Sequence, residues 1–376
     1  MPAPVLSTHS RAGMNSTHRL KIGLFGANCS SGRAVTAIEG RWSGSWADSL
    51  KLAQMADEAG FDFMLPIGRW KGYGGDTDYQ GATLETITWA AGLLAKTKRI
   101  NAFGTVHAPL IHPVVAAKAM VTADQIGEGR FGLNLVCGWN QDEFEMFGIE
   151  QRDHEARYAY AQEWLDAIKM MWTREEEFSF EGEFLHLRHV RAKPKPFGGT
   201  RPYVMNAGAS PSGQAFAIRN CDGIFISASL QALDAAAESV RRVLGLAASQ
   251  SRELDIFTAG VITCRPSRKE AEEYERYVLF ENADWGAVDH ILAMKGVTQD
   301  KHDRETFQRL RANQAYGLGG LRLVGSPDDI ARDLAAIHAA GITGIGFSFV
   351  HYLNELPYFC DEVIPRLVRL GLRNSH

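Results

Sequence analysis

The sequence lacks several features that would assign it to common functional classes. Lysine and arginine total 40 against 44 aspartates and glutamates, so the formal net charge of −4 leaves no positive surplus for nucleic acid. No segment approaches the roughly 18–20 continuous apolar residues of a membrane span, and we expect no membrane partner. The N-terminus also lacks the apolar core of a secretory signal. We therefore expect residues 1–19 to form a flexible, loosely packed arm.

Cysteine is scarce, and its five copies are odd in number and widely scattered. Because no two of them form a CxxC pair, the sequence predicts neither a disulfide framework nor a zinc site, and we expect no metal. This usage fits a reducing compartment, and we expect a cytoplasmic protein.

Motifs of several large enzyme classes are also missing. The sequence has no GxSxG, no HExxH, no phosphate-binding P-loop and no complete GxGxxG fingerprint. The glycine-rich segment 316–325 does not follow a predicted strand and lacks the rest of that fingerprint. Serine hydrolysis therefore has no support, and no nicotinamide site is evident.

Short apolar runs instead alternate with amphipathic stretches, which is typical of βα units around a parallel sheet. Helices are predicted at 46–60, 82–97, 112–129, 157–172 and 326–340, with others beginning near Ser210, Gln231 and Ser267. Strands are predicted at 20–26, 61–66, 99–106, 130–136, 201–208, 223–228, 255–264 and 344–350. Eight strands and eight helices in alternation predict an α/β fold, a single TIM (β/α)8 barrel over residues 20–376.

Two insertions interrupt this pattern. Residues 173–196 predict a hairpin that ends in a Pro/Lys connector. Residues 280–320 are polar and irregular, and we expect an active-site lid or a partly mobile loop there.

Catalytic groups of a TIM barrel lie at the C-terminal ends of its strands. Thr105 and His107 share one face of the third strand, and Asn134 shares a face of the fourth strand with Gly132. We place these small and polar groups on the lumen side. An inward asparagine without a partner would cost roughly 1–3 kcal/mol, so its presence predicts that something uses the amide.

Phosphate-binding groups occur at two predicted helix starts. Arg157 and Tyr158 open one helix, and Ser210 opens another. A guanidinium, a hydroxyl and the free N–H groups of a helix N-terminus suit a phosphate dianion. The segment 68–75 mixes glycines, cations and aromatics, as does a loop that covers a planar or anionic ligand.

Each of these residues also has a simpler interpretation. Thr105 can be a strand filler, Asn134 can satisfy a neighbouring backbone group, and His107 can be packed in the lumen. Glu143 can be a solvated loop carboxylate, and the Arg157–Tyr158 pair can lie on the surface. His112 is better interpreted as a helix-start residue before Pro113.

Longer segments resemble a known family. They are "GFDFMLPIGRWKGYGG", "TLETITWAAGLLAKTKRI", "ADQIGEGRFGLNLVCGWNQDEFEMFG", "HEARYAYAQEWLDAIKMMW", "FSFEGEFLHL", "KPKPFGGTRPYVMNAGASPSG" and "NELPYFCDEVIPRL". In this order they resemble the bacterial luciferase-like, FMN-dependent, two-component (group C) monooxygenases. The likeness is greatest to the branch with pyrimidine, dibenzothiophene-sulfone and dimethylsulfone monooxygenases. The loop 27–46 and residues 280–320 depart from that pattern, which leaves the substrate open.

The resemblance implies FMN contacts at Gly68, Arg69, Asn134, Glu143, Arg157, Tyr158 and Ser210. It also implies a catalytic oxygen pocket beside the flavin N5, formed by Leu65, Thr105 and Asn134, and chemistry through a flavin-N5-(per)oxide. A leucine would give O2 a dry wall, while the hydroxyl and the amide would donate hydrogen bonds to developing charge.

The implied enzyme would use reduced FMN (FMNH2) and O2, with NAD(P)H acting only through a separate NAD(P)H:flavin reductase. It would oxygenate a small molecule and cleave a C–N, C–S or C–halogen bond. Assembly as a homodimer or homotetramer is expected from the family. The aromatic residues suggest a flat or aromatic substrate, although most of them can instead pack against the flavin or the loops. As substrate contacts we select Trp70, His107 and Trp139 from a set that also contains Trp42, Trp46 and Tyr73.

Two other functions remain open. The chain could be an F420-dependent oxidoreductase of the same superfamily, although hydride transfer needs no oxygen pocket. It could also be a flavin-binding barrel without catalytic activity.

Overall fold

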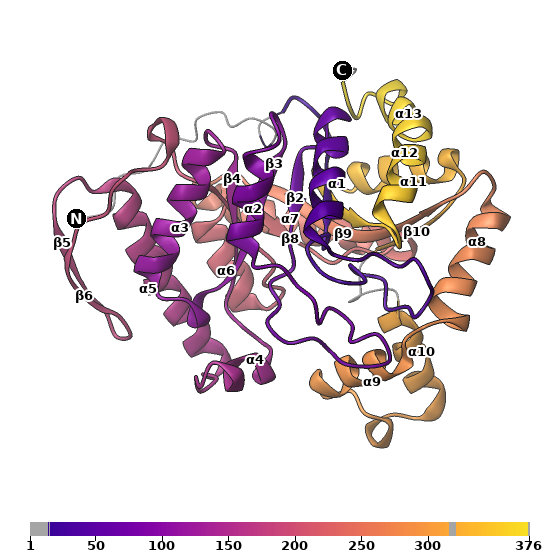
Figure 1. Ribbon diagram of the computed structural model, residues 1–376, viewed down its shortest axis with the longest axis horizontal. Helices are drawn as coiled ribbons and strands as arrows, with labels where there is room; N and C mark the ends of the chain where they lie inside the picture. Colours follow the sequence, from indigo (N-terminus) through magenta and orange to yellow (C-terminus); the bar gives the residue numbers. More distant parts are fainter. Residues whose placement is uncertain (1–13, 15, 316–320, 375–376) are drawn as a thin grey trace.

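Eight parallel strands close into a barrel in the computed structural model, which describes Met14, residues 16–315 and residues 321–374 (Figure 1). The strands follow the order β11-β1-β2-β3-β4-β7-β8-β9, and β9 closes the ring by pairing with both β8 and β11. Their bounds are β1 Lys21–Phe25, β2 Phe63–Leu65, β3 Asn101–His107, β4 Phe131–Val136, β7 Tyr203–Asn206, β8 Gly223–Phe225, β9 Asp255–Cys264 and β11 Gly344–Ser348. The predicted TIM barrel is confirmed, with each strand at a predicted position.

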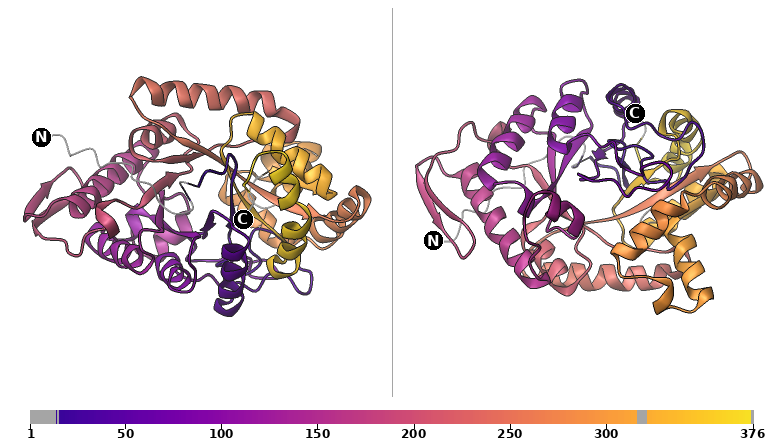
Figure 2. Two further views of the ribbon diagram at one scale, coloured as in Figure 1. Left: turned by 90° about the horizontal axis from the view of Figure 1, so that it is seen from above. Right: turned by 60° about the horizontal axis from the view of Figure 1, so that its bottom comes forward.

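Helices surround this barrel, as the view from above shows (Figure 2). They are α1 Trp46–Glu58, α2 Thr86–Leu94, α3 Pro113–Ile126, α4 Gln141–Met146, α5 His154–Thr173, α6 Pro211–Asn220, α7 Leu233–Ser249, α8 Arg268–Arg276, α11 Pro327–Ala339, α12 Tyr352–Glu362 and α13 Ile364–Arg369. His112 is the N-cap of α3, in agreement with its predicted place at a helix start, and the helix predicted at 326–340 begins with Ser326, whose side chain forms a capping box with Asp329. Within the described residues, no helix combines the length and apolar character needed to cross a lipid bilayer.

The hairpin predicted at 173–196 is present as β5 Phe178–Glu181 and β6 His186–Val190, which projects from the barrel (Figure 1). The second insertion differs from the prediction. Residues 280–315 are largely helical, with α9 Trp285–Met294 and α10 Arg304–Ala315, rather than irregular. Residues 316–320 lie outside the described part. The sequence predicts no strand in the segment 316–325, yet β10 Leu321–Gly325 pairs with the C-terminal half of β9.

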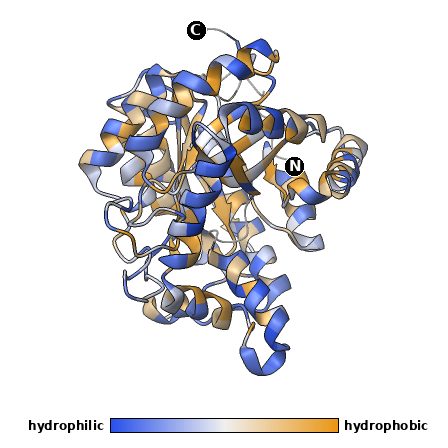
Figure 3. Ribbon diagram, turned by 90° about the vertical axis from the view of Figure 1, so that its right-hand side faces the viewer, coloured by the Kyte–Doolittle hydropathy of each residue, from blue (hydrophilic) through white to orange (hydrophobic). Residues whose placement is uncertain are grey.

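Phenylalanine rings that pack against glycine residues fill the barrel lumen on the side away from the C-terminal ends of the strands. Phe63 lies 6.1 Å from Phe103 and 5.7 Å from Phe257 between ring centroids. A Cβ on Gly132 would come within 2.3 Å of the Phe103 ring, so this face of β4 points inward. Apolar residues gather on the strands and inner helix faces in Figure 3.

The predicted arm at residues 1–19 is described only at Met14 and residues 16–19. Met14 is buried in the apolar cluster of the barrel lumen that contains Phe63 and Phe103. Ser16 and His18 both form hydrogen bonds with Asp62. This end of the arm is therefore packed against the barrel.

Candidate active site

A cavity of about 440 Å³, here called the large cavity, opens at the C-terminal end of the barrel. Because the strands are parallel, their C-terminal ends converge on it. The predicted site residues in its wall are Gly68, Arg69, Thr105, His107, Asn134, Trp139, Arg157, Tyr158 and Ser210. Side chains from β3, β4, α5 and the start of α6 thus meet at one place.

Asn134 and Thr105 face each other across neighbouring strands. They are paired in the β3–β4 register, and Asn134 Nδ2 donates to Thr105 Oγ1 at 3.2 Å. The Thr105 hydroxyl donates in turn to the carbonyl of Pro66 at 2.6 Å. The Thr105 hydroxyl therefore donates to the backbone. This differs from the expectation that it donates a hydrogen bond to the charge that develops on O2. Asn134 retains one N–H and a buried Oδ1 without a hydrogen-bond partner.

Leu65 adjoins this pair through a second cavity. The lumen pocket, of about 240 Å³, is lined by Leu65 and Asn134 together with residues of β8 and β9. It shares Phe25, Asn134, Ala207 and Ala209 with the large cavity. The three predicted oxygen-pocket residues thus lie around one junction, with Leu65 as its apolar wall.

The residues predicted to bind phosphate, Arg157, Tyr158 and Ser210, also lie in the wall of the large cavity. Ser210 is the N-cap of α6, and its hydroxyl accepts from Gly213 N at 3.1 Å. A Cβ on Gly213 would lie 2.5 Å from the Tyr158 hydroxyl, so glycine allows this close approach. Burial raises the pKa of Tyr158, which keeps its hydroxyl protonated as a donor. A guanidinium, two hydroxyls and a helix N-terminus can together hold a phosphate dianion.

Arg69 and Glu143 form a buried ion pair beside the cavity. Arg69 Nη1 lies 2.8 Å from Glu143 Oε1, and that oxygen also accepts from Trp70 N at 2.8 Å. Glu143 is only 1% exposed, so it is not a solvated loop carboxylate. The guanidinium stacks 4.6 Å from the centroid of Tyr73 and 5.7 Å from that of Trp139. Glu143 Oε2 and Arg69 Nε remain buried without hydrogen-bond partners.

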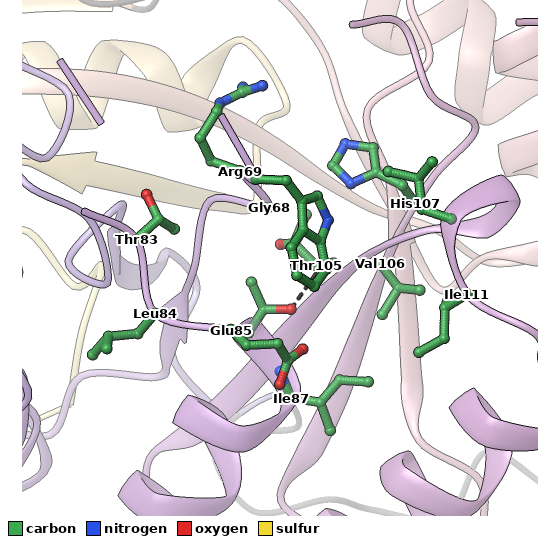
Figure 4. A pocket seen from close by; sticks show the side chains of 13 residues that line it. Gly68, Arg69, Thr83, Leu84, Glu85, Ile87, Thr105, Val106, His107 and Ile111 are labelled. Atoms are coloured by element: carbon green, nitrogen blue, oxygen red, sulfur yellow. Dashed lines mark hydrogen bonds between the residues drawn. The ribbon is translucent and has the colours of Figure 1, made fainter. Parts of the chain in front are cut away.

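His107 separates the large cavity from a side pocket of about 80 Å³ behind the end of β3, shown in Figure 4. Gly68, Arg69 and Thr105 also border both spaces. Burial lowers the pKa of His107 to about 4, although the Glu143 carboxylate opposes this shift. The imidazole is therefore neutral near pH 7 and can donate one hydrogen bond and accept another.

The tryptophans do not form one aromatic pocket. Trp139 lies in the large cavity, whereas Trp70 borders the side pocket and packs edge-on against Phe147. Trp42 is buried with its indole N–H on the Ala27 carbonyl, and Trp46 packs over Gly92 of α2. Trp42 and Trp46 therefore line neither cavity.

The sequence assigned no specific role to two further polar residues that line the large cavity. Asn206 donates to Leu135 O at 2.7 Å and accepts from Gly208 N, which fixes the turn into α6. His154 Nε2 lies 2.9 Å from Ser210 Oγ, and its Nδ1 lies 3.3 Å from Arg157 Nη2. The helix starts at His154 rather than at the predicted residue 157, and the i,i+3 spacing to Arg157 was the available signal.

These groups define an α/β-barrel enzyme site with a cofactor-sized cavity. Its wall carries phosphate donors together with Asn134 and Arg69, which each have a buried atom without a hydrogen-bond partner, as does Glu143 in the ion pair beside the cavity. Such atoms cost free energy until a ligand satisfies them, so the donor set fits a phosphorylated ligand with a polar planar ring.

Comparison with known proteins assigns the family. The family model of the Luciferase-like monooxygenases matches residues 20–344, and the chain belongs to that family. It is 29% identical over 359 residues to the FMNH(2)-dependent dimethylsulfone monooxygenase of Pseudomonas putida, covering 93% of this chain and 95% of that protein. It is also 29% identical over 358 residues to the pyrimidine monooxygenase RutA of Allorhizobium ampelinum, covering 92% and 95%. The crystal structure of DmoA from Hyphomicrobium sulfonivorans has the same fold, with a TM-score of 0.84, 17% identity and coverage of 95% and 90%.

Proposed function

We propose that this protein is the oxygenating component of a two-component, FMNH2- and O2-dependent monooxygenase. It would oxygenate a small, flat or aromatic molecule with cleavage of a C–N, C–S or C–halogen bond. The observation that carries the proposal is the meeting of the phosphate donors and the Leu65/Thr105/Asn134 junction around one cavity. Homologues of nearly full length that are named as FMNH2-dependent dimethylsulfone monooxygenases support it.

The protein would bind FMN at two places, the phosphate and the polar edge of the ring. Arg157, Tyr158 and Ser210 would bind the phosphate, with His154 bridging two of them. The backbone of Gly68, the buried pair of Arg69 and Glu143, and the amide of Asn134 would bind the polar edge of the ring. When bound, the reduced flavin supplies two electrons and the atom at which O2 is activated, N5 in this proposal.

The residues at the junction have different tasks. Leu65 excludes water from the space beside Asn134, which limits the loss of activated oxygen as hydrogen peroxide. Asn134 offers its free N–H to charge that develops on oxygen. Thr105 positions that amide, because its hydroxyl is anchored to Pro66 and accepts from Asn134 Nδ2. Neutral His107 can hold or deliver a proton at the edge of the large cavity.

The proposal is tested by mixing the apoprotein with photoreduced FMN and then with oxygen while recording the flavin spectrum. Reduced FMN should bind, and its reoxidation should differ in rate and spectrum from that of free flavin. Absence of binding, or reoxidation as in buffer, would contradict the proposal. Turnover in strict anaerobiosis with reduced F420 would favour the F420-dependent alternative.

The phosphate end has a separate test. Arg157→Met should weaken FMN binding roughly 10- to 100-fold, because it removes charge-assisted hydrogen bonds worth about 1.5–3 kcal/mol. Riboflavin, which has no phosphate, should bind nearly as before. Arg152→Met is the control, since Arg152 stacks on Tyr160 near the same helix. Equal losses for FMN and riboflavin would argue against a phosphate contact.

Two partners follow from this function. A separate NAD(P)H:flavin reductase would supply FMNH2, and the barrel would assemble as a homodimer or homotetramer. Turnover that requires an added flavin reductase, and sedimentation at two or four times the chain mass, are the expected results.

A further inference from the structure

The side pocket behind the end of β3 has a mainly apolar wall (Figure 4). Ile87 and Val106 in this wall are each 5% exposed. Leu84, Leu110 and Ile111 also line the pocket and are half-buried. The wall thus runs from partly exposed side chains to buried ones, which places the pocket between solvent and the C-terminal end of β3.

Three polar side chains of this wall have hydrogen-bond partners in the nearby backbone. Thr83 Oγ1 donates to a backbone carbonyl at 2.8 Å, and Thr86 Oγ1 donates to the Thr105 carbonyl at 2.9 Å. The Glu85 carboxylate accepts from two N–H groups in the first turn of α2, at 3.0 and 2.8 Å. A buried water typically makes about three hydrogen bonds, and these engaged groups offer it few. The pocket therefore favours a small apolar ligand over water.

Gly68, Thr105 and His107 stand between the side pocket and the large cavity, since each of them lines both spaces. A Cβ on Gly68 would come within 2.8 Å of His107 Cε1 and 3.1 Å of Thr105 Cγ2, so the glycine keeps this partition thin. The Thr105 hydroxyl accepts from Asn134 Nδ2 at 3.2 Å, so one side chain borders the side pocket and contacts the amide of the junction. His107 is neutral near pH 7, which spares the partition a charge that would attract water.

We propose that the side pocket binds O2 and passes it to the Leu65/Thr105/Asn134 junction. This inference rests on the proposed function, in which that junction activates O2. The O2 molecule is apolar and little larger than water, so a space of about 80 Å³ can hold it. It would cross the partition during the fast side-chain motions of a folded protein. A separate entry lets O2 reach the flavin while FMN and the substrate fill the large cavity.

Xenon gives a test of the site that does not depend on flavin chemistry, because this apolar atom occupies dry cavities. Methyl-labelled apoprotein is placed under xenon pressure, and its methyl resonances are recorded. The resonances of Leu84, Ile87 and Val106 should shift in wild type. Leu110→Trp, which fills the pocket with a larger side chain, should abolish these shifts. Leu50→Trp, at a half-buried position of α1 outside the pocket, is the matched control and should keep them.

Oxygen kinetics test the delivery. Protein loaded with reduced FMN is mixed with buffers of increasing O2 concentration, and the second-order rate constant of flavin reoxidation is measured by stopped flow. Leu110→Trp should lower this constant at least about fivefold, because the blocked pocket raises the barrier to oxygen entry. Its dissociation constant for FMN should stay within about twofold of the wild-type value. Leu110→Ala and Leu50→Trp should react at nearly the wild-type rate.

The outcomes separate this proposal from the proposed function. Absence of xenon shifts in wild type overturns the gas site. A wild-type oxygen rate in a Leu110→Trp variant that excludes xenon overturns delivery through the pocket, as does an equal loss of rate in Leu50→Trp. If Leu110→Trp does not fold, Leu84→Trp fills the same pocket from the segment before α2. Failure of wild type to bind reduced FMN would refute the proposed function and with it the delivery of O2, whereas the xenon shifts would still decide whether the pocket binds a gas.

Discussion

At the scale of single residues, Asn134 shows both the reach and the limit of sequence reasoning. A carboxamide inside an apolar strand predicts a partner, because an unsatisfied buried amide is costly. The sequence could not show that Thr105 would be that partner, since the β3–β4 register joins residues 29 positions apart. Nor could it show that the Thr105 hydroxyl donates its hydrogen bond to the Pro66 carbonyl, which leaves the Asn134 amide as the available donor.

Replacement of Asn134 by alanine should spare folding and abolish productive oxygenation. Loss of one donor to developing oxyanion charge typically costs about 10²–10³ in rate. The measurement is product formed per FMNH2 oxidised, with the thermal unfolding midpoint as the check on folding. Exposed Asn354 on α12 provides the control variant Asn354→Ala. Wild-type coupling in Asn134→Ala would refute the role assigned to this amide.

His107 should make stability depend on pH. Its pKa of about 4 in the folded state lies below the usual value of 6.5 because of burial. Between these values the unfolded chain binds the proton more readily than the folded protein does. The contribution of His107 to stability is therefore fully present above pH 6.5 and declines as the pH falls toward 4. Urea unfolding should show a loss of about 2 kcal/mol between pH 7 and pH 5 from this group. His107→Gln should remove that part, whereas His112→Gln at the start of α3 should not. An unchanged slope in His107→Gln would contradict the assignment.

At the scale of elements, sequence periodicity located the barrel strands, their helices and the hairpin insertion at 173–196, but it misjudged some helix boundaries and the second insertion. Helix α5 starts three residues before its predicted start, and that extra turn carries His154 into the site. Residues 280–315 are polar on their exposed faces, which hides two helices whose buried residues pack on the loop 68–81. Contacts between such distant segments carry no local periodicity, so the sequence could not reveal them.

Asp284, the N-cap of α9, joins this insertion to the loop 68–81, whose first residues Gly68 and Arg69 line the large cavity. Its carboxylate accepts from Asp76 N, Thr77 N and Thr77 Oγ1 at 2.7–3.1 Å, and from Ala287 N. Burial raises the pKa of Asp284, but these hydrogen bonds lower it and their effect is larger. The stabilisation is therefore present above the usual pKa of an aspartate and is lost as pH falls through the lowered value.

Asp284→Asn should loosen the loop, because an amide accepts fewer hydrogen bonds and adds donors that face other donors. Hydrogen exchange at the amides of Asp76 and Thr77 should become at least about tenfold faster. Asp289→Asn on the same helix removes an exposed ion pair with Arg311 and should leave these amides unchanged. Equal protection in wild type and Asp284→Asn would show that the loop is held by other contacts.

At the scale of the whole molecule, the barrel has the candidate site at one end and a buried ion pair between Arg373 and Asp62 at the other. The sequence predicts the fold because eight βα repeats impose the same local pattern many times. The sequence does not predict this ion pair, which connects Arg373 near the C-terminus, through Asp62, with Ser16 near the N-terminus. Arg373 Nη1 lies 2.7 Å from Asp62 Oδ2, and both side chains are buried. Asp62 also accepts from Ile22 N and from Ser16.

Arg373→Ala should therefore lower stability without changing the site. Removing one partner of a buried ion pair typically costs about 3–5 kcal/mol, because the remaining charge is left without compensation. Burial alone raises the pKa of Asp62, and the bonds from His18 and Arg373 lower it further than burial raises it. The stabilising effect of the pair thus persists above the usual aspartate pKa and fades as the solution is acidified. Urea unfolding at pH 7 should show the loss, whereas FMN affinity below the transition should equal that of wild type. Arg369→Ala, on the exposed side of α13, is the matched control. A variant that keeps full stability, or one that loses FMN affinity while still folded, would show that the two ends of the barrel are not independent.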